Sequence, residues 1–310
     1  MIEGLLERWG FYLTFSDFGG VGANDMKFLM ELDKVKVSGF TRKLPSSITQ
    51  NSPELIRNRH MARRLFLQVL TARLLVFRMF LEEARKLRPD VSPDNYRDRW
   101  VYFQLQPTEV TGDDIFQYMT KTLKNANDEY LDDAGQFLSR DIRTEYLASI
   151  HDFYIVLDEA QLAAKSCTEA FRSYVDPNQS RPLLQVIMHT VHDLRLGPTI
   201  ISGTGLSGKI VNKAMESRVA KQGKGFLTVS KIGAFDSQLT QQNYIRQYLP
   251  SFYVDTPSGE ALLNRAWDWL RGRYVFMYLC ASFANKTHLK ASFYCEFHST
   301  PTERFLMLAT

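Results

Sequence analysis

The sequence predicts an α/β fold in which helices cover both faces of a parallel sheet, followed by a helical C-terminal part. Short apolar runs that indicate buried strands alternate with helical patterns over residues 1–236, as is typical of parallel sheets. Residues 237–310 carry helical patterns and no further strand pattern. We therefore expect a three-layer αβα core over 1–236 and a helical lid or extension over 237–310.

Composition limits the class of protein. The chain has 310 residues, a net charge of +4 and 45% apolar residues, which is ordinary for a globular protein and permits an anionic ligand. Three widely spaced cysteines favour a reducing compartment and argue against structural zinc. The N-terminus lacks a signal-peptide pattern, and Arg73 and Arg78 interrupt the most apolar stretch. We expect a cytoplasmic or nuclear protein that does not enter a membrane.

The first elements follow from periodicity and from Gly and Pro. Residues 1–9 have helical spacing, Gly10 ends the pattern, and residues 11–15 read as a strand. A polar stretch with two prolines follows at 38–57, where we expect a loop. A long helix is predicted over 59–87, because its apolar residues recur at steps of three and four.

Five arginines flank the apolar stripe of that long helix. They are Arg59, Arg63, Arg64, Arg73 and Arg78. A nucleic-acid surface is one interpretation, and a solvated helix face is the one we favour, because such charge runs commonly face water.

The middle of the chain is less regular. Trp100–Leu105 is rich in aromatic and branched residues and is predicted to be a strand. A helix is predicted over 111–124, a polar loop over 125–139 and a second helix over 140–150.

Two further buried strands are predicted at 153–157 and 198–202, and a short one at 226–229. Helices are predicted between the first two, at 160–172 and 183–194. This alternation supplies the parallel sheet of the predicted core.

The strand at 153–157 runs directly into two acidic residues, Asp158 and Glu159. The carboxyl ends of parallel strands are where open α/β sheets bind ligands. In P-loop NTPases such a strand carries an Asp that holds Mg²⁺ and a Glu that polarises the attacking water. An ordinary buried strand followed by a helix N-terminus is the competing interpretation.

Small polar residues follow the strand at 198–202. Ser202 and Thr204 fit the position of a sensor that reads the γ-phosphate or the attacking water in the P-loop arrangement. The competing interpretation is a Gly-rich turn after a strand.

A near match to a phosphate-binding loop occurs at Gly203–Ile210, where Lys209 follows a glycine-rich run. Ile210 stands where the Mg²⁺-binding Ser or Thr is required, and the run comes after the acidic strand. We favour the sensor interpretation and keep phosphate binding by this loop as an alternative.

Two arginines, Arg271 and Arg273, surround a glycine in the helical part. At the start of a lid helix such arginines could reach a γ-phosphate. A surface turn with two solvated charges is the alternative.

Several short motifs together resemble the P-loop NTPase module of Crinkler-type proteins of fungi and oomycetes, which is related to the AAA/STAND group. The resemblance extends over about residues 1–280 of the 310. The motifs are Glu3–Tyr12, Leu157–Gln161, Ile201–Ser207, Gly233–Asp236, Tyr248–Pro250 and Trp269–Arg273.

The resemblance implies an ATP-binding module that acts as a switch or motor in an intracellular, effector-like system. It implies Asp158 as the Mg²⁺ residue, Glu159 for water activation, Ser202 or Thr204 as sensor, and Arg271 and Arg273 as lid or finger arginines. Its cofactors would be ATP and Mg²⁺, and its partners a nucleotide and other proteins.

No GxxxxGK[ST] loop precedes residue 153, and residues 1–15 look like the helix and strand that follow such a loop. We expect that the loop lies ahead of Met1 or has been lost. A non-catalytic interaction scaffold derived from an NTPase fold is therefore the alternative function.

Overall fold

The fold is described from a computed structural model. It describes residues 2–16, 21–34, 37–147, 153–203, 206, 210–211, 237–246, 249 and 251–270. These residues divide into two compact units, the elements from α1 to β5 and the elements from α11 to α13. Each unit is described by itself.

Helices make up most of the first unit. Its elements are α1 (Ile2–Glu7), β1 (Gly10–Thr14), α2 (Lys27–Lys34), α3 (Pro53–Leu87), η1 (Pro93–Tyr96), α4 (Arg97–Leu105), α5 (Pro107–Thr111), α6 (Ile115–Thr122), η2 (Leu123–Asn125), α7 (Asp128–Glu145), β2 (Tyr154–Asp158), α8 (Gln161–Lys165), β3 (Phe171–Arg172), β4 (Ser180–Arg181), α9 (Leu183–Leu194) and β5 (Thr199–Ile201).

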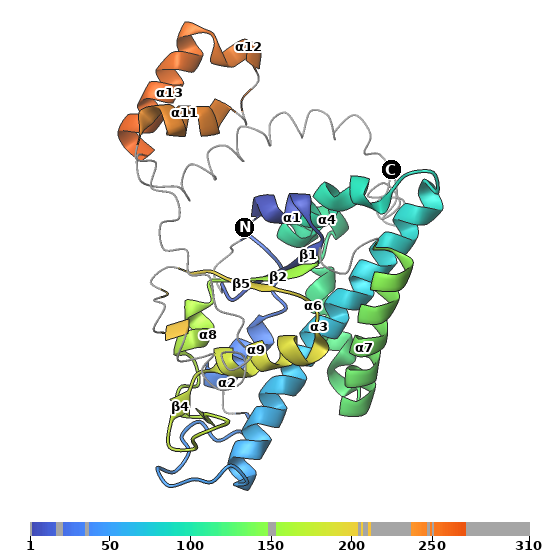
Figure 1. The fold of residues 1–310 in the computed structure, drawn as a ribbon, viewed down its shortest axis with the longest axis vertical. Helices are drawn as coiled ribbons and strands as arrows, with labels where there is room; N and C mark the ends of the chain where they lie inside the picture. Colours follow the sequence, from blue (N-terminus) through green and yellow to red (C-terminus); the bar gives the residue numbers. More distant parts are fainter. Residues whose placement is uncertain are drawn as a thin grey trace. The chain divides into compact units, whose positions relative to one another are not determined.

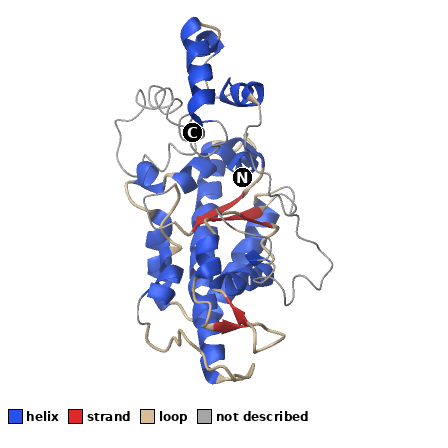
Figure 2. Ribbon diagram, turned by 90° about the vertical axis from the view of Figure 1, so that its left-hand side faces the viewer, coloured by secondary structure: helices blue, strands red, loops and turns tan. Residues whose placement is uncertain are grey.

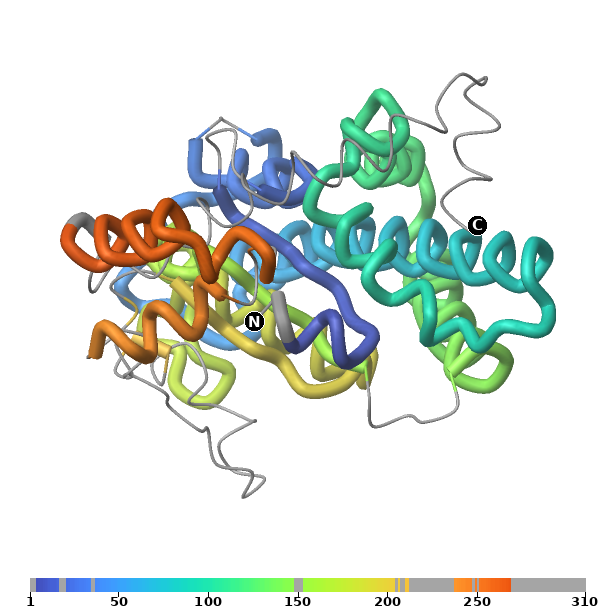
Figure 3. The backbone as a smooth tube through the Cα atoms, turned by 90° about the horizontal axis from the view of Figure 1, so that it is seen from above, coloured from blue at the N-terminus to red at the C-terminus, as the bar shows by residue number. Residues whose placement is uncertain are grey.

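A parallel sheet of three strands lies inside this unit, in the order β1-β2-β5 (Figure 1). The strands predicted at 11–15, 153–157 and 198–202 are thus confirmed to within two residues. Figure 3 shows the N-terminal strand running alongside β2, although the two are far apart in the sequence. The chain is therefore mixed α/β with a small parallel sheet, as the strand pattern predicted.

Alternate strand residues point to opposite faces of the sheet, and both faces are covered by helices. Phe11 and Leu157 join the main apolar core, to which α3 and α9 contribute. Tyr12 and Val156 face the other way and pack with Leu5 of α1 and with α4. The result is a buried strand pair, as expected for parallel strands between helices.

The free edge of β1 is closed by side chains of α4. Gln104 accepts a hydrogen bond from the Tyr12 N–H (2.9 Å) and donates one to the Gly10 carbonyl (3.1 Å), to which the Trp100 indole also donates (2.9 Å). Gln104 thus takes the place of a neighbouring strand. The prediction of a strand at 100–105 is wrong: Trp100, Phe103 and Gln104 lie at helical spacing and turn one face of α4 toward β1 and the core.

The longest helix, α3, runs alongside α7 (Figure 1). Arg63 forms a bidentate ion pair with Asp132 (2.6 and 2.8 Å), and Arg78 binds Asp141 (2.7 Å). The loop predicted at 125–139 is therefore wrong, because its acidic residues belong to α7 and meet the arginines of α3. These arginines stabilise a helix pair.

Two other predicted helices are shorter than expected. The helix predicted at 160–172 ends at Lys165, since Cys167 has a left-handed φ of 55° and turns the chain into β3. Strand β3 pairs antiparallel with β4, and this hairpin lies against α3 (Figure 2). The helix predicted at 111–124 is divided between α5 and α6, with Gly112 at a φ of 82° between them.

The second unit contains α11 (Gln238–Arg246), α12 (Ser251–Val254) and α13 (Pro257–Leu270). Ile245, Val254 and Leu263 form its apolar core. The strand predicted at 226–229 lies outside the described residues.

No helix in the described ranges is both long enough and apolar enough to cross a membrane. The stretch at 65–81, the most apolar of the sequence, lies within α3 and is largely buried against neighbouring helices.

Candidate functional site

A cluster of polar side chains lies where the parallel strands end. Asp158 is the last residue of β2, and Ser202 directly follows β5. The Ser202 hydroxyl donates a hydrogen bond to Asp158 Oδ1 at 2.5 Å. The structure thus brings together two residues that were predicted separately as metal-binding residue and sensor.

A third member of the cluster, Tyr12, was missed by the sequence analysis. Its hydroxyl, carried by β1, donates to Asp158 Oδ2 at 2.6 Å, and its ring is buried. Both hydroxyl bonds have the short lengths typical of charge-assisted hydrogen bonds. The sequence analysis predicted a strand at 11–15 that contains Tyr12. Which residue of this strand meets Asp158 depends on how the strand pairs with its neighbour, and the sequence does not give that register.

Glu159 turns the chain sharply after β2. Its φ of 53° is left-handed, which costs a non-glycine residue about 1 kcal/mol. This turn directs the Glu159 N–H back to Asp158 Oδ1 (3.0 Å), and the Glu159 carboxylate accepts a hydrogen bond from the Gln161 amide. Strained backbone of this kind is concentrated at functional sites.

The turns after β2 and β5 interlock. The Ala160 N–H donates to the Ser202 carbonyl at 2.9 Å. A Cβ atom on Gly203 would lie 1.8 Å from Gln161 Oε1 and 3.2 Å from the Ala160 nitrogen. A side chain at position 203 would therefore require the Gln161 amide to move.

The oxygens of Asp158 are mostly engaged. Oδ1 accepts from Ser202 and from the Glu159 N–H, and Oδ2 accepts from Tyr12. A carboxylate offers about four acceptor positions, which leaves one on Oδ2. The hydroxyl of Ser202 can also accept hydrogen bonds.

The oxygens of this cluster suit a hydrated cation better than a directly bound one. Mg²⁺ takes oxygen ligands and usually keeps several of its waters. No group of three or more His, Cys, Asp or Glu residues that could hold a metal occurs in the part of the chain that the structure describes.

The remaining predicted site residues cannot be placed in this cluster. Thr204, Lys209, Arg271 and Arg273 all lie outside the described residues. The alternative phosphate loop at Gly203–Ile210 is described only in part, and Ile210 packs against the main core.

No family model, curated protein or solved structure matches this chain. The interpretation of the Asp158 cluster therefore rests on its own geometry and on the motifs in the sequence.

Proposed function

We propose that this chain is an ATP-binding module of the P-loop NTPase type, with the three-layer core and the Crinkler-type relationship that its motifs indicate. Asp158 would hold Mg²⁺ through water, and Glu159 would orient the attacking water. Ser202 would act as the sensor. Thr204, Arg271 and Arg273 keep their predicted roles in this proposal as second sensor and lid arginines.

The observation that carries the proposal is the hydrogen bond between Ser202 and Asp158. It joins an acidic residue and a small hydroxyl residue at the ends of adjacent parallel strands. Ligands of open α/β sheets bind at this edge, outside the carboxyl ends of the strands. A hydroxyl bound to the metal-holding carboxylate can respond when a phosphate oxygen or water arrives.

The residues present fit a hydrated Mg²⁺ ion. The remaining acceptor position of Asp158 Oδ2 and the hydroxyl of Ser202 would accept hydrogen bonds from its waters. When bound, the ion would neutralise charge on the phosphate oxygens. Glu159 would exchange its hydrogen bond with Gln161 for one with water.

Equilibrium binding of a fluorescent ATP analogue, with and without Mg²⁺, tests the proposal. We expect saturable binding that Asp158→Ala weakens at least about tenfold, because metal-holding groups and their supports typically contribute that much. Asp133→Ala is the matched control, since Asp133 is exposed on α7 and the structure gives it no ion pair. Absence of Mg²⁺-dependent binding would refute nucleotide binding by this chain, and equal weakening by both variants would refute the role of Asp158.

Hydrolysis is tested separately by Glu159→Gln. We expect this variant to bind the analogue normally and to lose turnover, because a neutral amide cannot accept the proton of the attacking water. Turnover equal to that of the parent would remove Glu159 from the mechanism.

A second function, a non-catalytic interaction scaffold, is favoured by one observation. Both oxygens of Asp158 are already satisfied by protein donors, so the cluster can serve to fasten the three strands together. In that case Asp158→Asn would lower the free energy of unfolding, and nucleotide would not raise the melting temperature of the parent chain at any Mg²⁺ concentration.

A further inference from the structure

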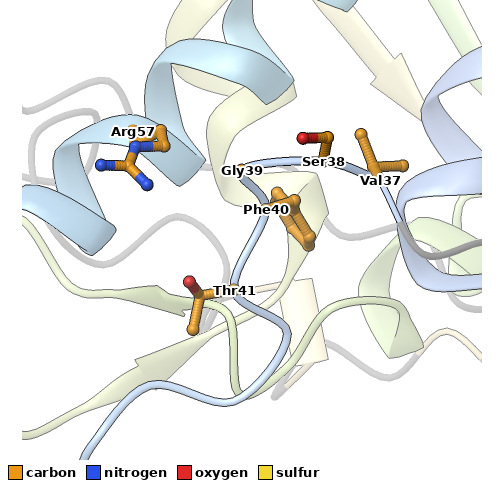
Figure 4. A pocket seen from close by; sticks show the side chains of 6 residues that line it. All are labelled: Val37, Ser38, Gly39, Phe40, Thr41 and Arg57. Atoms are coloured by element: carbon orange, nitrogen blue, oxygen red, sulfur yellow. The ribbon is translucent and has the colours of Figure 1, made fainter.

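A hollow in the first unit shares no residue with the Asp158 cluster. It has a volume of about 480 Å³ and is lined by Val37, Ser38, Gly39, Phe40, Thr41 and Arg57 (Figure 4). The hollow is open to solvent, and Ser38, Gly39 and Arg57 are exposed on its wall. Five of these six residues belong to the loop between α2 and α3, and the sixth is Arg57 of α3.

The loop is held in place by buried groups. The amide of Asn58, which is fully buried, accepts from the Thr41 N–H (2.9 Å) and donates to the carbonyls of Thr41 (2.6 Å) and Ala170 (2.8 Å). The Phe40 ring packs edge-on against Phe171, with 6.0 Å between centroids. Since loops are usually the more mobile parts of a protein, this degree of fixation preorganises the hollow.

Three polar groups at the hollow are not engaged elsewhere. The hydroxyls of Ser38 and Thr41 and the guanidinium of Arg57 make no hydrogen bond or ion pair with any residue that the structure describes. In Figure 4 the hydroxyl end of each of these two side chains is the end nearer to Arg57. All three groups can donate hydrogen bonds, so together they suit an acceptor-rich ligand.

The charge around the hollow favours an anion. Among the residues that line the hollow, the charged one is the cation Arg57. A surface with one sign of charge concentrates ligands of the opposite sign. Val37 and Phe40 supply the apolar part of the wall, which an inorganic ion alone would not use.

We propose that this hollow binds a small phosphate monoester with a compact apolar body. Arg57 would take the phosphate as a bidentate partner, and the hydroxyls of Ser38 and Thr41 would donate to its remaining oxygens. Val37 and Phe40 would contact the apolar body. This site is independent of nucleotide binding at Asp158.

Calorimetric titration of the full chain with phenyl phosphate tests the proposal. We expect Arg57→Ala to weaken binding at least about tenfold, because it removes a charge-assisted bidentate contact. Arg42→Ala is the matched control: it removes the same charge from the neighbouring loop between α2 and α3, but Arg42 does not line the hollow. We expect less than about a twofold change, as for other exposed charges. Thermal melting of each variant verifies that it is folded.

Two comparisons complete the test. Inorganic phosphate should bind more weakly than phenyl phosphate because it leaves the apolar wall unused, and Asp158→Ala should bind phenyl phosphate as the parent does. No saturable binding by the parent, equal weakening by Arg57→Ala and Arg42→Ala, or equal affinity for the two phosphates would overturn the proposal. Phenyl phosphate binding without Mg²⁺-dependent nucleotide binding would uphold this site and refute only the function proposed for Asp158.

Discussion

A buried ion pair between Arg73 and Asp25 provides the sharpest test of how this fold is held together. Both side chains are fully buried. Arg73 Nε lies 2.6 Å from Asp25 Oδ2, and its Nη2 lies 3.0 Å from Oδ1. The guanidinium also stacks 4.0 Å from the centre of the Phe116 ring. Removing either charge therefore leaves the other in a site that water does not reach.

Replacing one partner should destabilise the fold strongly. Breaking a buried pair typically costs about 3–5 kcal/mol, and a domain's whole stability is only about 5–15 kcal/mol. We expect this loss for Arg73→Met and for Asp25→Leu. The double variant removes both charges and replaces them with apolar groups, so it should lose less than about 2 kcal/mol.

Urea unfolding followed by circular dichroism measures the four free energies of this cycle. The partly exposed pair Arg63–Asp132 is the control, and the same cycle there should give a coupling energy below about 1 kcal/mol. The reasoning is refuted if the losses of Arg73→Met and Asp25→Leu simply add in the double variant, or if either single loss is below about 1 kcal/mol. In either case the two buried charges do not depend on each other for stability.

Two substitutions test the strand-end cluster, and one labelling experiment tests a buried thiol. Tyr12→Phe keeps the ring but removes the hydrogen bond to Asp158, and should cost about 1.5–3 kcal/mol in urea unfolding; a loss under about 0.5 kcal/mol would contradict the bond. Glu159→Gly should leave stability unchanged or raise it by up to about 1 kcal/mol because glycine tolerates the left-handed φ, whereas Gln136→Gly inside α7 should cost about 1 kcal/mol. Burial raises the pKa of the Cys167 thiol to about 12, so at pH 8 its thiolate fraction is roughly a thousandfold below that of a free thiol. Iodoacetamide labelling with peptide mapping should therefore leave Cys167 unmodified while the chain is folded, and rapid labelling would refute its burial. Because the folded pKa is raised, the stability from the protonated thiol is complete below pH 9 and is lost as the pH rises toward 12.

The three strands of the parallel sheet could be predicted from the sequence because each is a short apolar run between helical patterns, whereas β3 and β4 were not predicted. The predictions for α4 and α7 were wrong for two different reasons. In α4, aromatic and branched residues raised strand propensity, but Trp100 and Gln104 are needed on one helical face to cover β1. In α7, polar residues hid a helical repeat of Leu131, Leu138 and Ile142. Tertiary contacts with β1 and α3 decided both cases.

The cluster could be predicted in part. Asp158 and Ser202 stand at the ends of strands, and the ends of parallel strands meet at one edge whatever the register. Tyr12 reaches Asp158 from inside β1, so its role depends on strand register. The left-handed φ of Glu159 belongs to the turn that follows β2, and no local sequence pattern predicts it.

The wide sequence separation inside the cluster has a consequence for how the unit folds. Tyr12 and Asp158 are 146 residues apart, and the helices α2 to α7 lie between their strands. Contacts of such long range form slowly, whereas α3 and α7 can pair earlier from closer positions. We expect helical circular dichroism to recover before the fluorescence of Trp9 and Trp100, which flank β1. Any ligand that needs Tyr12, Asp158 and Ser202 together binds only the completed fold, so its binding energy stabilises the entire unit.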